Sequence, residues 1–250
     1  MLNTVTHGQP NSNTPLLIAH GLFGSARNWG VIAKRLSDDR QVIAADMRNH
    51  GKSDWFPTHS YGDLADDLGE VIRSLNVPVD VLGHSMGGKA AMVLALTQPE
   101  LVRRLVVADI APVSYPGVDL APIAAMRSVD LSRVERRADA AEQMHSIPDE
   151  LKPFLLQSLD LGNKRWRLNL DTLEREMERI RGFPEIRGDF QGPTLFLAGA
   201  DSNYVQAAHR PSILSLFPNA EIEYIPHAGH WLHAEKPREF EAAVRAFLDR

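Results

Sequence analysis

Short apolar runs separated by helical patterns constrain the fold of this chain most. Each run is bounded by turn residues, and the helical patterns between the runs include Leu64–Leu75 and Lys89–Leu96. Strands that alternate with helices form parallel βαβ units, whose helices cover both faces of the sheet. We therefore expect an α/β fold with a mostly parallel sheet flanked by helices. The expected strands are Leu16–Ala19, Gln41–Ala45, Val79–Leu82, Leu105–Ala108, Thr194–Ala198 and, nearer a sheet edge, Glu221–Ile225.

The alternation stops between residues 113 and 191, a stretch rich in Arg, Glu, Leu and Ala. Helical patterns there cover Leu120–Arg127, Ala138–His145, Asp149–Gln157 and Asp171–Arg181. The stretch enters between two strands, on the side where such sheets bind ligands. We predict a core made of residues 1–112 and 192–250 and a helical cap of residues 113–191 over the active site. The alternative is an insertion that only covers the sheet edge.

Composition excludes several classes of protein. The 250 residues include no cysteine, so disulfides, zinc–thiolate sites and cysteine nucleophiles are ruled out. Acidic and basic residues are mixed along the chain with a net charge of -5, which gives no basic surface for nucleic acid. The start, MLNTVTHGQPN, does not resemble a secretory leader, and no apolar stretch reaches the length of a membrane span. We expect a soluble protein of cytoplasmic type that acts on a small molecule.

The segment Gly83–Gly87 has the pattern G-x-S-x-G and lies between an expected strand and an expected helix. In this context the glycines allow a sharp turn that exposes the central serine hydroxyl, as a nucleophile requires. Ser85 is therefore our candidate nucleophile. The alternative is a serine that only caps the helix.

A serine hydroxyl needs a base, which in this arrangement lies far downstream. His230, in Ala228–Trp231 after the last expected strand, fits best, and the neighbouring Gly229 lets its loop turn back. His227 and His233 are the rival candidates.

Attack on an acyl group also needs main-chain donors for the negative oxygen. One is expected to be the N–H of Met86, the residue after the nucleophile. The other is expected in the loop His20–Gly24, after the first expected strand, with Leu22 as first choice and Phe23 as second.

Two aspartates compete to orient the base. Asp201 follows the strand Thr194–Ala198, where many proteins of this type place their acid, but its spacing is off by one residue. Because strand side chains alternate in direction, such a slip can turn a carboxylate away. Asp109 ends the strand Leu105–Ala108, on the same sheet edge as Ser85. From the residues alone, both positions stay open.

Other residues are candidates for the pocket or for the scaffold. Asp46 and Arg48 follow an expected strand, and we expect them to tie loops together through charge-assisted hydrogen bonds. The candidates for lining the substrate pocket are Phe23, Trp29, Leu155, Trp166 and Trp231.

Five segments resemble the YbfF-type esterases of the α/β-hydrolase superfamily. They are His20–Ser25, Asp46–Gly51, Gly83–Lys89, Asp109–Val113 and Ala228–Trp231. The resemblance runs over nearly the whole chain and is weakest in the cap.

The resemblance implies an α/β-hydrolase fold and a carboxylesterase or acyl thioesterase that uses no cofactor or metal. It also implies a triad of Ser85, Asp109 and His230, with Ser202 beside the histidine. The rival functions are C–C hydrolase, lyase or perhydrolase activity on the same fold, or a binding protein without catalysis.

Overall fold

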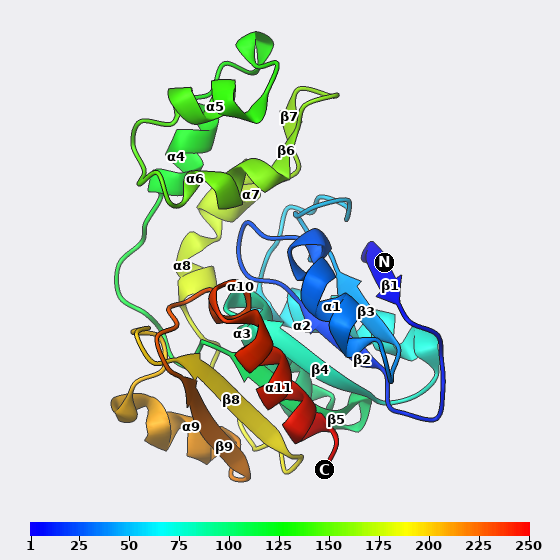
Figure 1. The fold of residues 1–250 in the computed structure, drawn as a ribbon. Helices are drawn as coiled ribbons and strands as arrows, with labels where there is room; N and C mark the ends of the chain where they lie inside the picture. The colour runs from blue at the N-terminus through cyan, green and yellow to red at the C-terminus, as the bar shows by residue number, and fades with distance from the viewer.

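The computed structural model describes all 250 residues, and a seven-stranded sheet forms its centre (Figure 1). The strand order is β1-β3-β2-β4-β5-β8-β9. All neighbours pair in parallel except β1 with β3, which are antiparallel. The strands are β1 Thr4–His7, β2 Leu16–Ala19, β3 Val42–Ala45, β4 Val79–His84, β5 Val102–Ala108, β8 Thr194–Gly199 and β9 Ala220–Ile225. The expected mostly parallel sheet is confirmed.

Strand β1 is the one strand of this sheet that the sequence reasoning missed. Its four residues are exposed or half-buried, and they pair only with β3 at the edge of the sheet. A strand with no buried face lacks the apolar alternation that identifies strands from sequence.

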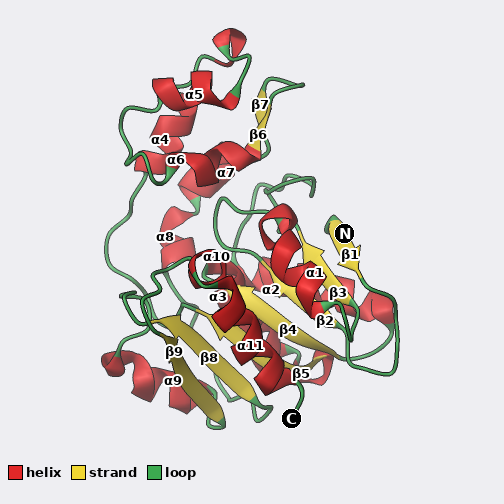
Figure 2. Cartoon of the chain, viewed as in Figure 1, coloured by secondary structure: helices red, strands yellow, loops and turns green.

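Helices cover both faces of the sheet (Figure 2). On one face, α1 and α11 pack together over a core that includes Leu16 and Ile18. On the other face, α2 and α3 pack over a core that includes Leu17 and Ala19. Alternate residues of one strand thus supply both cores, as the pleat requires. The helices of this half are α1 Gly30–Leu36, α2 Tyr61–Leu75, α3 Met86–Thr97, α9 Arg210–Leu216, α10 Leu232–Glu235 and α11 Pro237–Leu248, with 3-10 turns at Ala26–Trp29, Pro99–Leu101 and Ala207–His209.

The segment between β5 and β8 forms a helical lobe beyond the sheet (Figure 1). Its helices are shorter than expected. The pattern 171–181 is divided into two helices at Glu176, and the pattern 149–157 begins only at Lys152. A small hairpin, which no sequence pattern indicated, also lies here. The elements are α4 Ala121–Arg127, α5 Arg137–Gln143, α6 Lys152–Leu155, β6 Leu159–Asp160, β7 Arg165–Trp166, α7 Leu170–Arg175 and α8 Met177–Arg181, with 3-10 turns at Leu131–Arg133 and Leu156–Ser158.

None of the helices combines the length and the apolar composition that crossing a membrane would require.

Candidate active site

Ser85 occupies a strained turn between β4 and α3. Its φ of 52° and ψ of -118° lie outside the regions that most residues adopt. The neighbouring glycines allow the turn to pack closely. A Cβ on Gly87 would lie 2.3 Å from the carbonyl oxygen of Ala19, and one on Gly83 would lie 2.3 Å from that of Gly87. Any side chain at either position would collide with backbone, so the two glycines permit the geometry that exposes the Ser85 hydroxyl.

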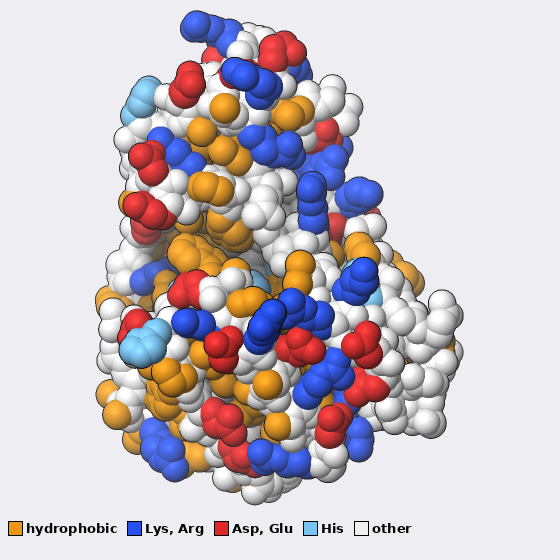
Figure 3. Space-filling view, in the orientation of Figure 1, with side chains coloured by type: hydrophobic (Ala, Val, Ile, Leu, Met, Phe, Trp, Pro, Cys, Tyr) orange, Lys and Arg blue, Asp and Glu red, His pale blue; other side chains and the backbone are white.

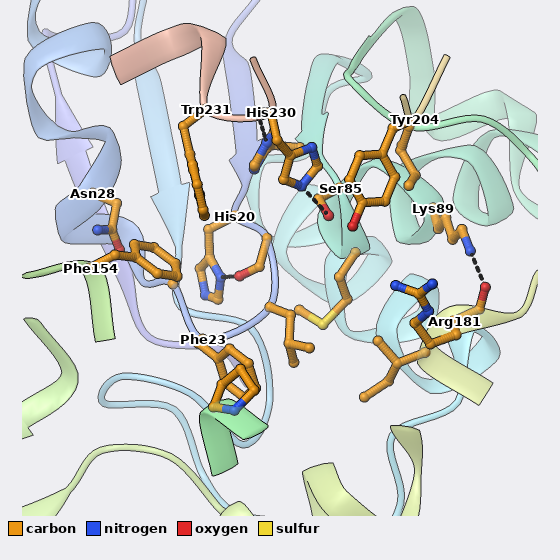
Figure 4. A pocket seen from close by; sticks show the side chains of 18 of the residues that line it. His20, Phe23, Asn28, Ser85, Lys89, Phe154, Arg181, Tyr204, His230 and Trp231 are labelled. Atoms are coloured by element: carbon orange, nitrogen blue, oxygen red, sulfur yellow. Dashed lines mark hydrogen bonds between the residues drawn. The ribbon is translucent and has the colours of Figure 1, made fainter. Parts of the chain in front are cut away.

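The imidazole of His230 lies between Ser85 and Asp109. Its Nε2 is 3.1 Å from the Oγ of Ser85, and its Nδ1 is 2.7 Å from Oδ2 of Asp109. Figure 4 shows the ring directed at the hydroxyl. With Nδ1 donating to the carboxylate, Nε2 is left free to accept the proton of Ser85. A serine nucleophile, a histidine base and a carboxylate that orients the base require this arrangement.

The carboxylate of Asp109 is fully buried and has two further donors. The hydroxyl of Ser202 donates to Oδ2 at 2.5 Å, and the main-chain N–H of Gly199 donates to Oδ1 at 3.0 Å. Asp201 is exposed, and only its main-chain N–H is engaged, with the carbonyl of Ala228. The structure thus brings Asp109, not Asp201, to His230, with Ser202 alongside.

Neither of the two rival histidines is hydrogen-bonded to Ser85, whose hydroxyl is paired with His230. His227 is exposed, whereas His233 is buried and stacks on Trp29 with ring centroids 4.2 Å apart. Burial lowers the pKa of His233 to about 3.

Two neighbours of His230 were missed from the sequence. The Nε2–H of His84 donates to the main-chain oxygen of His230 at 2.8 Å, and burial keeps the pKa of His84 well below its usual value. The ring of Tyr204 stacks on the imidazole at 4.1 Å between centroids. His84 is the variable residue before the serine in the motif, and nothing in the sequence around Tyr204 marks it out.

The loop after β2 and the first residue of α3 contain the main-chain N–H groups that the sequence suggested as donors. The N–H of Leu22 has no acceptor within the protein, and Leu22 lines the cavity beside Ser85. The N–H of Met86 is the first of α3, a position that has no partner within a helix. The second choice, Phe23, is unsuitable because its N–H already donates to Nε2 of His50 at 3.1 Å.

A cavity of about 230 Å³ opens over Ser85, between the sheet and the helical lobe. Figure 3 shows the hollow, with hydrophobic side chains at its margin. Of the expected pocket residues, Phe23, Trp29 and Trp231 line it. The lobe contributes Tyr115, Asp119, Pro122, Leu151, Phe154, Met177, Ile180 and Arg181.

Leu155 and Trp166 do not line this cavity, which corrects our expectation for them. Both are buried in the apolar core of the lobe, and the indole N–H of Trp166 donates to the carbonyl of Met126 at 2.9 Å. The neighbour of Leu155 on α6, Phe154, faces the cavity instead, where its ring lies 5.8 Å from that of Trp231.

Asp46 and Arg48 contact the scaffold and do not line the cavity. The carboxylate of Asp46 accepts the main-chain N–H groups of Ala26 and Lys52. Arg48 donates to both carboxylate oxygens of Asp67, at 2.6 and 2.9 Å. Asp46 thus joins two loops, as expected, whereas Arg48 joins its loop to helix α2.

The model of the alpha/beta hydrolase family matches residues 16–243. The chain belongs to that family. It is 44% identical over 248 residues to the sn-1-specific diacylglycerol lipase ABHD11 of Mus musculus, covering 93% of this chain and 80% of that protein. Its identity to esterase YbfF of Escherichia coli (strain K12) is 38%, covering 96% and 94% of the two chains.

Among solved structures, a marine microorganism esterase superimposes with a TM-score of 0.93 at 38% identity, covering 98% of both chains. The thioesterase domain from the curacin biosynthetic pathway shares the fold, with a TM-score of 0.72 at 19% identity. The chain is thus a hydrolase enzyme with the α/β-hydrolase fold, and the resemblance to YbfF-type esterases is confirmed.

Proposed function

We propose that this hydrolase cleaves carboxylic esters of small molecules through an acyl intermediate on Ser85. The observation that carries the proposal is the hydrogen-bonded series Ser85–His230–Asp109 at the cavity, with the N–H groups of Leu22 and Met86 close by. The esterase and lipase names of the relatives support the same reaction class.

In the first half of the proposed reaction, His230 removes the proton of Ser85 as the oxygen attacks the ester carbonyl. The N–H groups of Leu22 and Met86 hold the negative oxygen of the tetrahedral intermediate, each lowering the barrier by about 2.7–4 kcal/mol. Asp109 stabilises the imidazolium that forms. The imidazolium then protonates the leaving alcohol, and an ester of Ser85 remains.

In the second half, His230 activates a water molecule that attacks this ester. The same main-chain donors hold the second intermediate, and the acid leaves as Ser85 regains its proton. An acyl thioester follows the same steps with a thiol as leaving group, so we include thioesters among the proposed substrates.

The size of the cavity favours a small substrate. Its volume of about 230 Å³ is below the roughly 300–1,000 Å³ of pockets that enclose drug-sized ligands. We propose that residues 113–191 act as a cap whose cavity-lining side chains select the substrate. The cytoplasmic location expected from the sequence stays a prediction.

Two experiments test the function. A fluorophosphonate probe should label the wild type at Ser85 and leave Ser85→Ala unlabelled, whereas a binding protein without catalysis would not react. A panel of p-nitrophenyl esters should be hydrolysed, and Ser85→Ala should lose several orders of magnitude in turnover. Retention of a tenth of the activity would remove Ser85 from the mechanism. Failure to cleave any ester or acyl thioester would favour the C–C hydrolase, lyase or perhydrolase alternatives.

A further inference from the structure

Two cationic side chains line the cavity on the far side of Ser85 from Trp231. In Figure 4, Trp231, Phe154 and Asn28 lie on one side of the serine. Tyr204, Lys89 and Arg181 lie on the other side. Lys89 follows Ser85 by four residues on α3, which is one helical turn, or about 6 Å along the axis. Arg181 is the last residue of α8, in the helical lobe.

Neither cation is neutralised by a carboxylate of the protein. The ammonium of Lys89, 1% exposed, donates to the main-chain oxygens of Arg181 and Gly182 at 2.8 and 2.6 Å. The guanidinium of Arg181 donates to the carbonyl of Pro116 at 2.6 Å, and its buried Nε has no partner. The one acidic residue in the cavity wall, Asp119, is exposed and accepts the N–H of Ala121.

Arg40 and Arg48, two buried arginines of this chain, do have acidic partners. Arg40 contacts the carboxylates of Asp80 and Asp249, and Arg48 pairs with Asp67. A cation removed from water without a counter-charge is costly, and a buried donor without an acceptor adds to that cost. The cavity wall therefore holds two basic side chains without a counter-charge, which an anionic ligand would supply.

We propose that Arg181 and Lys89 form an anion subsite, which makes the preferred substrates esters that carry a carboxylate a few bonds from the scissile group. The carboxylate would accept a hydrogen bond from the guanidinium of Arg181, whose side chain lines the cavity, and would favour the charged form of Lys89. The proposal rests on the ester-hydrolase function above and names its substrate class.

The electrostatics of Lys89 fit such a subsite. Burial, together with the charge of Arg181, lowers the pKa of Lys89 to about 7. Its ammonium also lies 4.8 Å from the centre of the Tyr115 ring, a contact that favours the cation. An anion beside the two groups would favour the charged form of Lys89 further.

Matched esters test the proposal at pH 7. Monoethyl glutarate carries the carboxylate on the acyl side, and ethyl 5-methylhexanoate is its neutral isostere. The acetate ester of 4-hydroxybutanoate carries it on the alcohol side, with 4-methylpentyl acetate as the isostere. We expect kcat/KM for at least one anionic ester to exceed that of its isostere about tenfold or more. Arg181→Met should reduce this ratio about 10- to 100-fold.

The control variant is Arg179→Met, on the same helix, because Arg179 is exposed and pairs with Glu176 outside the cavity. It should leave the ratio as in the wild type, and Arg181→Lys should restore part of the preference. Equal or poorer turnover of both anionic esters, or a ratio unchanged in Arg181→Met, would overturn the subsite.

Calorimetry separates this proposal from the proposed function. Ser85→Ala, titrated with each anionic ester and its isostere, reports binding without turnover. Tighter binding of an anionic ester that Arg181→Met abolishes supports the subsite even if no ester is cleaved. Turnover of neutral esters without any preference for the anion in binding overturns the subsite and leaves the ester-hydrolase function standing.

Discussion

The Nε2 of His50 accepts a hydrogen bond from the main-chain N–H of Phe23 at 3.1 Å. The other ring nitrogen donates to the carbonyl of Arg48, so the ring is neutral, and burial holds the pKa of His50 well below its usual value. Phe23 has a φ of 64°, in the left-handed region that residues other than glycine rarely occupy. His50 therefore fixes a strained peptide next to Leu22, a proposed donor to the oxyanion.

Replacing His50 with Leu should release this peptide and displace the N–H of Leu22. We expect kcat to fall about 10²-fold, because one oxyanion donor is misplaced, with a smaller change in KM. His50→Gln, which offers an acceptor near the position of Nε2, should recover part of kcat. Steady-state kinetics on one p-nitrophenyl ester checks this. An equal loss in both variants, or a loss confined to KM, would contradict the positioning role.

The identity of the triad acid can be decided by two variants. Asp109→Asn should lower kcat about 10³- to 10⁴-fold, because an amide favours the wrong tautomer of His230. Asp201→Asn should cost less than tenfold, since that carboxylate is exposed and has no contact with His230. The two rates on one p-nitrophenyl ester provide the measurement, and the reverse order would assign the role to Asp201.

Phe154 and Leu155 are neighbours on α6 that should respond differently to alanine. Phe154→Ala removes a side chain from the cavity wall and so enlarges the cavity. It should change the order of turnover rates for esters with short and long acyl chains. Leu155→Ala empties a fully buried position in the lobe and should cost about 2–5 kcal/mol of unfolding free energy. Ester panels and urea unfolding of both variants test the pair. If Leu155→Ala alone altered the ranking of esters, our placement of the cavity wall would be wrong.

Buried neutral histidines should make the protein less stable in acid. The pKa values of His59 and His233 are lowered to about 3 by burial, whereas an unfolded histidine titrates near pH 6.5. Between these values the unfolded chain binds a proton that the folded chain does not. The free energy of unfolding should therefore fall as the pH drops below 6.5, by up to about 1.4 kcal/mol per pH unit for each histidine.

Removal of one such histidine should flatten this dependence. His233→Phe keeps an aromatic ring beside Trp29. Between pH 7 and pH 5, the free energy of unfolding of this variant should fall by about 2 kcal/mol less than that of the wild type. Urea unfolding at each pH provides the measurement. His145→Gln, at an exposed position, should follow the wild-type curve. A slope unchanged in His233→Phe would show that this residue is not a source of the acid sensitivity.

Features with a strong local signal could be predicted from the sequence. The glycines around Ser85, between a strand and a helix, predicted the turn, because a side chain at Gly83 or Gly87 would collide with backbone. The buried strands, with continuous apolar runs, were also predicted close to their bounds. Edge strand β1, whose side chains face water, gave no such signal.

Features that depend on the rotation of one helix could not be predicted. Phe154 and Leu155 differ by one position, which is about 100° around a helix, and sequence spacing did not show which of them faces the cavity. The choice between Asp109 and Asp201 likewise depends on how two strand ends and a loop meet in space. The ring of Tyr204 stacks on that of His230, although the two residues belong to different loops. No local sequence pattern indicates that these loops meet.

The helical lobe leaves the sheet after β5 and returns at β8, and these two strands are neighbours. Lys89 holds the end of α8 through main-chain oxygens, which every amino-acid sequence supplies. We therefore expect that a lobe from another member of the family, grafted between the two strands, would still offer main-chain oxygens to Lys89. With the cap role that we propose for this lobe, we expect substrate preference to be exchangeable with the lobe, during evolution or in the laboratory, while the triad on the sheet is left unchanged.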